Sequence, residues 1–214
     1  MDWENGKIFE ENMNLNKLAH GISWVFHPFL LPLYMIILLL TFTAFKTYPF
    51  ALKCYLMWVV VLYTILIPIL SLVLLRKMGY VSDYRIDIRR ERILPLLVGI
   101  ISYLLCALTI SKLPSVLLFR KFMIAAAACE LLALVVSTRW KISLHLTGMG
   151  AFTSILILMN VVTNSTLFIP LIFSIGASGL LASSRLYLGC HTGLQVFTGY
   201  CSGLLIAFIS MMYL

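Results

Sequence analysis

Charged residues are scarce in this chain. Lysine, arginine, aspartate and glutamate together make up 11% of the 214 residues, whereas 62% are hydrophobic. A soluble domain has about a quarter charged residues and about half apolar ones. The shortage of charge therefore excludes an ordinary soluble domain and indicates a protein that lies in a membrane.

Other common features are also absent from the sequence. The five cysteines form no Cys-x-x-Cys pair, and most lie in apolar runs, where cysteine behaves as a small hydrophobic residue. We therefore predict neither a disulfide framework nor a metal site, and no cofactor. The net charge is +8, but no basic stripe interleaved with aromatic residues indicates a nucleic-acid partner. The sequence contains no internal repeat and no low-complexity linker.

Apolar runs recur along nearly the whole chain, and each is long enough to cross the ~30 Å hydrocarbon core of a bilayer as a helix. We predict an all-α fold, a polytopic transmembrane bundle of six to seven helices. The fourth run is the weakest, because it is short and carries Glu130. The runs lie at about 22–45, 51–75, 93–111, 121–138, 143–162, 166–184 and 191–213.

The chain divides into a polar tail, residues 1–21, and a single transmembrane domain, residues 22–214. The tail lacks the basic-then-apolar order of a signal peptide. Of the 16 lysines and arginines, eleven fall on the membrane side that holds the tail, which we call face A, and five on the opposite face B. The positive-inside rule places face A in the cytoplasm. That inference weakens if several of these arginines bind a ligand.

Three polar clusters interrupt the apolar pattern, at residues 82–97, 139–148 and 183–205. All three fall on face A, and each combines cations with hydroxyl groups, histidine or glycine at a helix end. Helix N-termini and the planar fork of arginine both suit phosphate oxygens. The three clusters therefore predict one shared phosphate site at the membrane surface.

Two histidines in these clusters need a functional reason. His145 lies inside one apolar run and His191 opens another. Ionisable groups at membrane depth are costly and usually face the bundle interior or a wet cavity. By contrast, His27 precedes Pro28 at the start of the first run, and we interpret it as structural. We expect Glu130 to make a buried hydrogen bond inside the bundle.

The third cluster resembles a motif of the phosphatidic acid phosphatase type 2 superfamily, a set of membrane lipid phosphatases. That motif is Ser-Arg, five residues, His, three residues, Asp. This chain has Ser184, Arg185, His191 and then Gln195 at the same spacings. The resemblance covers residues 82–213.

The other two clusters resemble the remaining motifs of the family. Its second motif is Pro-Ser-Gly-His, of which Ser143 and His145 are present here. Its first motif is Lys, six residues, Arg-Pro. Arg85 and Arg92 match that spacing, and Arg89 is a competing choice.

The resemblance implies a function and roles for these residues. His191 would attack phosphorus to form a phosphohistidine, and His145 would protonate the leaving alcohol. The phosphate would be held by Arg85, Arg89, Arg92, Ser143 and Arg185. The substrate would be a phosphorylated lipid taken from the surrounding membrane lipids, the reaction would need no metal, and the protein would lie in a bacterial inner (cytoplasmic) membrane.

Gln195 departs from the family, which has aspartate at this position. Residue 195 lies one helical turn after His191 and can contact it, but an amide supplies no charge. Either activity is low, or another carboxylate such as Asp83, Asp87 or Glu91 substitutes, or catalysis is lost. Three functions stay open: a lipid-phosphate phosphatase or phosphotransferase, a non-catalytic protein that binds a phosphorylated lipid, and a transporter or channel.

Overall fold

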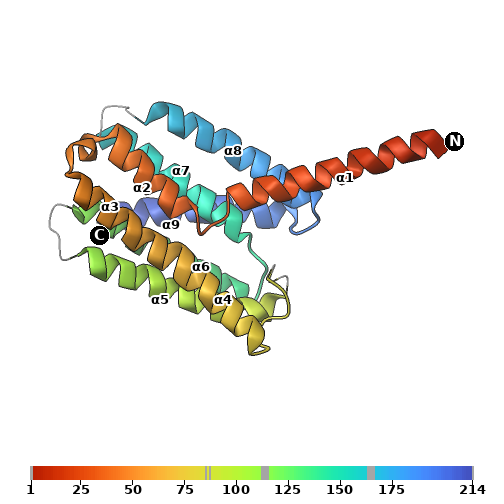
Figure 1. Cartoon of the computed structure of the whole chain (residues 1–214), viewed down its shortest axis with the longest axis horizontal. Coiled ribbons are helices and arrows are strands. Elements are labelled where there is room, and N and C mark those ends of the chain that lie inside the picture. The colour runs from red at the N-terminus through yellow and green to blue at the C-terminus, as the bar shows by residue number, and fades with distance from the viewer. Residues whose placement is uncertain (1, 85, 87, 112–115, 163–166, 214) are drawn as a thin grey trace.

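The computed structural model is a bundle of helices (Figure 1). It describes residues 2–84, 86, 88–111, 116–162 and 167–213, and side chains from residue 13 onward. Within these residues no β-strand is present, which confirms the predicted all-α class. In chain order the helices are α1 (Asp2–Val25), α2 (Leu31–Phe42), α3 (Phe50–Val61), α4 (Ile67–Lys77), α5 (Ile93–Ile110), α6 (Leu117–Ser137), α7 (Leu144–Val162), α8 (Phe168–Tyr187) and α9 (Gly193–Tyr213).

Five helical segments are long and apolar enough to cross a membrane, as expected of an integral membrane protein. They are Phe50–Lys77, Arg89–Ile110, Leu144–Val162, Phe168–Tyr187 and Gly193–Tyr213. Two further apolar helices are less clear. Helix α2 has 12 residues and is about 18 Å long, short of the ~30 Å core. Helix α6 has 21 residues but carries three charged side chains. Five spans are thus supported, and the count of seven stays a prediction.

The first apolar run is not one helix, contrary to our expectation of a span at about 22–45. Helix α1 ends at Val25 and α2 begins at Leu31. The cause is Pro28, which lacks a backbone N–H and disfavours the helical conformation of the residue before it. Pro32 lies in the first turn of α2, where proline is tolerated. The polar tail, in turn, is part of the long helix α1.

A π-helical turn at Leu62–Leu66 joins α3 to α4 into one continuous segment. Its wider winding leaves the carbonyl of Tyr63 available to a neighbouring helix. The Ser102 hydroxyl of α5 donates to that carbonyl over 2.5 Å. The turn therefore connects this segment to α5 by a polar contact inside the bundle.

The long helices run back and forth between two ends of the bundle. The α4–α5, α6–α7 and α8–α9 connections lie at the end where α1 meets the bundle, whereas the C-terminus lies at the other end (Figure 1). The three polar clusters of the sequence lie on these three connections and the adjoining helix ends, so the fold gathers them on one side.

Helices α7 and α9 pack closely because glycines on each helix lie against the backbone of the other. A Cβ at Gly203 of α9 would collide with the backbone of Thr147 on α7. A Cβ at Gly150 of α7 would likewise collide with the backbone of Tyr200 on α9. This close approach fixes the start of α7, which carries His145, against the start of α9, which carries Gln195.

Candidate functional site

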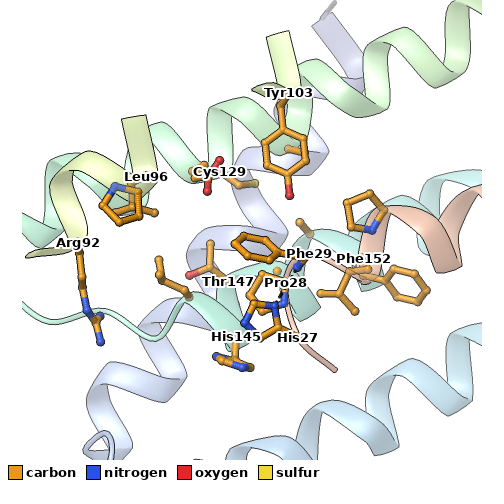
Figure 2. A pocket seen from close by; sticks show the side chains of 18 of the residues that line it. His27, Pro28, Phe29, Arg92, Leu96, Tyr103, Cys129, His145, Thr147 and Phe152 are labelled. Atoms are coloured by element: carbon orange, nitrogen blue, oxygen red, sulfur yellow. Dashed lines mark hydrogen bonds between the residues drawn. The ribbon is translucent and has the colours of Figure 1, made fainter. Parts of the chain in front are cut away.

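A cavity of about 180 Å³ opens within the bundle (Figure 2). Its walls come from the α1–α2 and α4–α5 connections and from α2, α4, α5, α6 and α7, with Arg185 of α8 and His191 of the α8–α9 connection. Much of the lining is apolar, and nine of the lining side chains are ionisable. These are His27, Tyr84, Arg92, Tyr103, Cys129, Glu130, His145, Arg185 and His191.

The structure brings together four of the eight residues that we predicted for the site. Arg92, His145, Arg185 and His191 all line this cavity, although they come from three separate parts of the sequence. Gln195 is a fifth member, because it contacts His191 directly.

The other three predicted residues have different positions. Arg89 donates to the carbonyl of Arg139 and does not line the cavity. Ser143 is fully buried, and its hydroxyl has no hydrogen-bond partner among the described residues. Its backbone N–H donates to the carbonyl of Gln195 over 3.4 Å, which ties α7 to α9 beside the site. Arg85 lies outside the described residues.

His191 is held in one tautomer by Gln195. The amide oxygen of Gln195 accepts from the Thr192 backbone N–H over 3.2 Å, which identifies it as an acceptor. The same oxygen lies 3.1 Å from Nδ1 of His191, so Nδ1 carries the proton of the neutral ring. The lone pair of Nε2 is then free for chemistry. Contact between residues 191 and 195 was expected from their spacing.

His191 is also neutral near pH 7. Burial, together with the charges of Arg185, Arg92 and Lys141, lowers the pKa of His191 to about 4, although the hydrogen bond to Gln195 raises it. Only 8% of the residue is exposed. A positive ring is disfavoured here because it would be both desolvated and close to other cations.

His145 is oriented by the last turn of α1. Its Nε2 lies 3.2 Å from the carbonyl oxygen of Ser23. A carbonyl can only accept, so Nε2 carries the proton and Nδ1 is the free nitrogen of the neutral ring. The ring of His27 meets that of His145 edge-on, with centroids 5.2 Å apart and an interplanar angle of 83°.

His27 was interpreted from the sequence as a structural residue, and the structure places it in the cavity wall. Its Nδ1 accepts the backbone N–H of Phe29 over 3.3 Å. The signal that would have located it is the His-Pro pair itself, because a proline within an apolar run breaks the helix. The backbone at such a break is tolerated at membrane depth where it lines a cavity.

The two arginines differ in how they are held. Arg92 is 5% exposed; its Nε donates to Ile86 over 2.9 Å and a terminal nitrogen donates to Ile142 over 3.1 Å. It therefore fixes the α4–α5 and α6–α7 connections to each other. The Nε of Arg185 is buried and has no hydrogen-bond partner among the described residues. An unsatisfied buried guanidinium donor at a cavity favours an anionic ligand.

The carboxylates considered as substitutes for the missing aspartate lie elsewhere. Glu91 accepts from the backbone N–H and the hydroxyl of Ser82, over 2.8 and 2.9 Å. Neither Glu91 nor Asp83 lines the cavity, and Asp87 lies outside the described residues. Glu130 does line it, and its Oε2 is buried without a hydrogen-bond partner among the described residues. Our expectation of a buried hydrogen bond for Glu130 is therefore wrong.

Fold and site together define a helical membrane protein with a cavity of imidazole and guanidinium groups near one end of its bundle. Within the described part of the chain, no three His, Cys, Asp or Glu side chains are grouped to hold a metal ion. The chain matches no family model, no curated protein and no solved structure.

Proposed function

We propose that the protein is an integral-membrane lipid-phosphate phosphatase or phosphotransferase that acts through a phosphohistidine on His191. The observation that carries this proposal is the fixed tautomer of His191. Its Nδ1 is engaged by Gln195, so its Nε2 lone pair is available in a cavity that also holds Arg92 and Arg185. A neutral imidazole is a competent nucleophile near pH 7.

In the first step, Nε2 of His191 attacks phosphorus, the N–P bond forms and the bond from phosphorus to the lipid oxygen breaks. The leaving alkoxide takes a proton from Nδ1 of His145, which requires the imidazolium form of that ring. Its Nε2–H stays bonded to the Ser23 carbonyl throughout. In the second step, water or another alcohol attacks phosphorus, gives its proton back to His145, and releases His191.

The arginines would stabilise charge on the phosphoryl oxygens. Arg92 is held by two backbone carbonyls, so its position is set before any ligand binds. Arg185 has a buried donor without a partner among the described residues, which a phosphate oxygen would satisfy. Cations positioned in advance stabilise a transferring phosphoryl group without any metal ion.

Gln195 favours a second candidate function, a protein that binds a phosphorylated lipid without cleaving it. The amide orients the ring of His191 but cannot neutralise the positive charge that the ring gains when Nε2 bonds to phosphorus. In a serine protease, replacing the orienting aspartate by its amide lowers kcat by about 10⁴. Under this alternative the side chains of Arg92, His145, Arg185 and His191 would bind the headgroup, and no phosphate would be released.

Phosphate release from a panel of lipid phosphates in detergent, with and without EDTA, tests the proposal. We expect wild-type protein to release phosphate in both conditions and His191→Ala to release none, because no nucleophile remains. His20→Ala is the matched control, since His20 is exposed on α1 and should leave the rate unchanged. Full activity in His191→Ala would refute a phosphohistidine at this position. Lipid binding without release by wild-type protein would support the second candidate.

A further inference from the structure

The cavity has a second polar part, separate from its imidazole and guanidinium groups. Tyr103 of α5 and Glu130 of α6 both line it. Tyr103 lies about three helical turns further along α5 than Arg92, so its Cα is about 16 Å deeper in the bundle. In Figure 2, Arg92 and Tyr103 stand on different sides of the cavity.

The Tyr103 hydroxyl is positioned to meet a ligand. The residue is 7% exposed, and its hydroxyl points into the cavity toward the side where Phe29 and Pro28 lie (Figure 2). It makes no hydrogen bond to the described residues around it. Buried tyrosine hydroxyls usually find a partner, so this one lacks a group that a bound molecule would supply.

Glu130 of α6 presents an unsatisfied group against the same stretch of α5. Its Oε2 is buried without a hydrogen-bond partner among the described residues. Gly99 precedes Tyr103 by four residues, so the two lie on the same face of α5, and the carboxyl of Glu130 packs against Gly99. Gly99 leaves the room for it, because a Cβ there would collide with both carboxyl oxygens. We therefore group Glu130 with Tyr103, and not with the imidazole and guanidinium groups of the cavity.

We infer that Tyr103 and Glu130 form a binding site for a neutral hydrogen-bonding group, a hydroxyl or an ester carbonyl, on the backbone of a lipid phosphate. The inference rests on the proposed function, in which the histidines and arginines of the cavity hold the phosphate. It selects glycerol- or sphingoid-based phosphates, which carry such groups a few bonds from phosphorus. A polyprenyl phosphate is hydrocarbon beyond its phosphate and would leave both protein groups unpaired, which is costly in a buried site.

A pair of matched lipids tests this inference. Palmitoyl lysophosphatidate and hexadecyl phosphate share the phosphate and the chain length, but only the first has a backbone hydroxyl and an ester. We expect wild-type protein in detergent to bind and cleave lysophosphatidate at least about tenfold better, since one buried hydrogen bond is worth roughly that factor. Tyr103→Phe and Glu130→Leu should each reduce the preference to about threefold or less.

Two control variants separate recognition from folding. Tyr63→Phe removes a hydroxyl that accepts from Thr109 outside the cavity, and it should keep the wild-type preference. Glu130→Gln keeps the size and a hydrogen-bonding group, and it should keep more of the preference than Glu130→Leu.

The outcomes distinguish this inference from the proposed function. If neither lipid is cleaved but lysophosphatidate binds about tenfold tighter in a thermal-shift assay, the proposed hydrolysis is refuted and the binding site at Tyr103 and Glu130 is supported. The binding site at Tyr103 and Glu130 is refuted, whatever the catalytic rate, by either of two results. One is equal binding and cleavage of the two lipids by wild-type protein, and the other is a preference that survives in both Tyr103→Phe and Glu130→Leu.

Discussion

At the scale of single residues, one hydrogen bond sets the chemical character of the site. Gln195 accepts from Nδ1 of His191 and so directs the free lone pair of Nε2 away from itself. An aspartate or glutamate would accept the same bond and would also place a negative charge beside the ring. A carboxylate would both orient the ring of His191 and compensate its positive charge. Gln195 orients the ring but supplies no charge.

Changing Gln195 to glutamate should raise the rate of phosphate release. The side chain keeps its length, so the bond to His191 is kept, and the new charge stabilises the phosphorylated, positive ring. We expect an increase in kcat of about tenfold, equivalent to ~1.4 kcal/mol of transition-state stabilisation. Single-turnover assays on wild type and Gln195→Glu measure it, with Gln195→Leu as the variant that loses orientation as well. An unchanged or lower rate in Gln195→Glu would show that charge compensation is not what limits turnover.

Acid should destabilise the folded protein through His191. Its pKa is about 4 in the folded state against 6.5 for an unperturbed histidine. Between these values the unfolded chain binds more protons, so stability is complete above about pH 6.5 and falls as the pH drops toward 4. One such group contributes up to about 1.4 kcal/mol per pH unit. Thermal unfolding in detergent at pH 7 and pH 5 measures the loss, which His191→Asn should reduce. An identical pH response in both proteins would contradict the assignment.

The sequence was sufficient to predict His145, His191, Arg92 and Arg185 as neighbours, because each lies beside a helix end on the same face. It was insufficient for His27 and Tyr103, which come from segments without a recognised motif. Tyr103 looks like any aromatic residue of an apolar helix until the fold shows where its hydroxyl points. The partners of Arg89 and Glu91 depend on loop geometry, which charge patterns do not encode.

At the scale of helices, the contact between α7 and α9 determines the spacing of the site. The glycines at 150, 199 and 203 allow the two backbones to approach closely, as small residues do between membrane helices. The hydrogen bond from the Ser143 N–H to the Gln195 carbonyl lies at the end of this contact. A change in helix separation would therefore be transmitted to His145 and His191.

Gly203→Ala should destabilise the protein and reduce any activity, because its Cβ meets the backbone of Thr147. Overpacking of this kind costs about 1–3 kcal/mol. Gly179→Ala in α8 is the matched control, since a Cβ there has open space within 4 Å and alanine favours a helix over glycine. Unfolding temperatures of the two variants in detergent test the prediction. Equal temperatures would mean that the α7–α9 contact adapts without cost.

Helix positions were largely predictable from apolar length. The run expected at 93–111 is α5 (Ile93–Ile110), and the run expected at 191–213 is α9 (Gly193–Tyr213). The break at residues 26–30 and the π turn at Leu62–Leu66 were not predicted. The break is caused by Pro28, which apolar length does not reveal, and the π turn has its hydrogen-bond partner, Ser102, on a different helix.

At the scale of the whole molecule, the two ends of the bundle differ in the residues they hold. One end holds the polar connections and the ionisable cavity, and the other holds the C-terminal end of α9 (Figure 1). The positive-inside rule predicts that the first end lies in the cytoplasm. The helices run between the two ends whichever compartment each end faces.

Reporter fusions at the two termini should therefore report from opposite compartments. The helices between α1 and the end of α9 run alternately between the two ends of the bundle, so the chain leaves on the side opposite to its entry. Paired alkaline phosphatase and fluorescent protein fusions measure this and also identify the compartment of the cavity. Signals from the same compartment at both ends would mean that one segment, most simply the charged α6, does not cross.

Helix α2, with its 12 residues, has a consequence for the surrounding bilayer. A hydrophobic helix about 18 Å long is shorter than a ~30 Å core, and we expect the lipid beside it to thin. Leu31 and Pro32 of this helix form part of the cavity wall, so we expect the thinned lipid to lie next to the cavity. Under the proposed function, a lipid would bring its phosphate to the arginines by lateral diffusion within one leaflet, with its tails in hydrocarbon throughout.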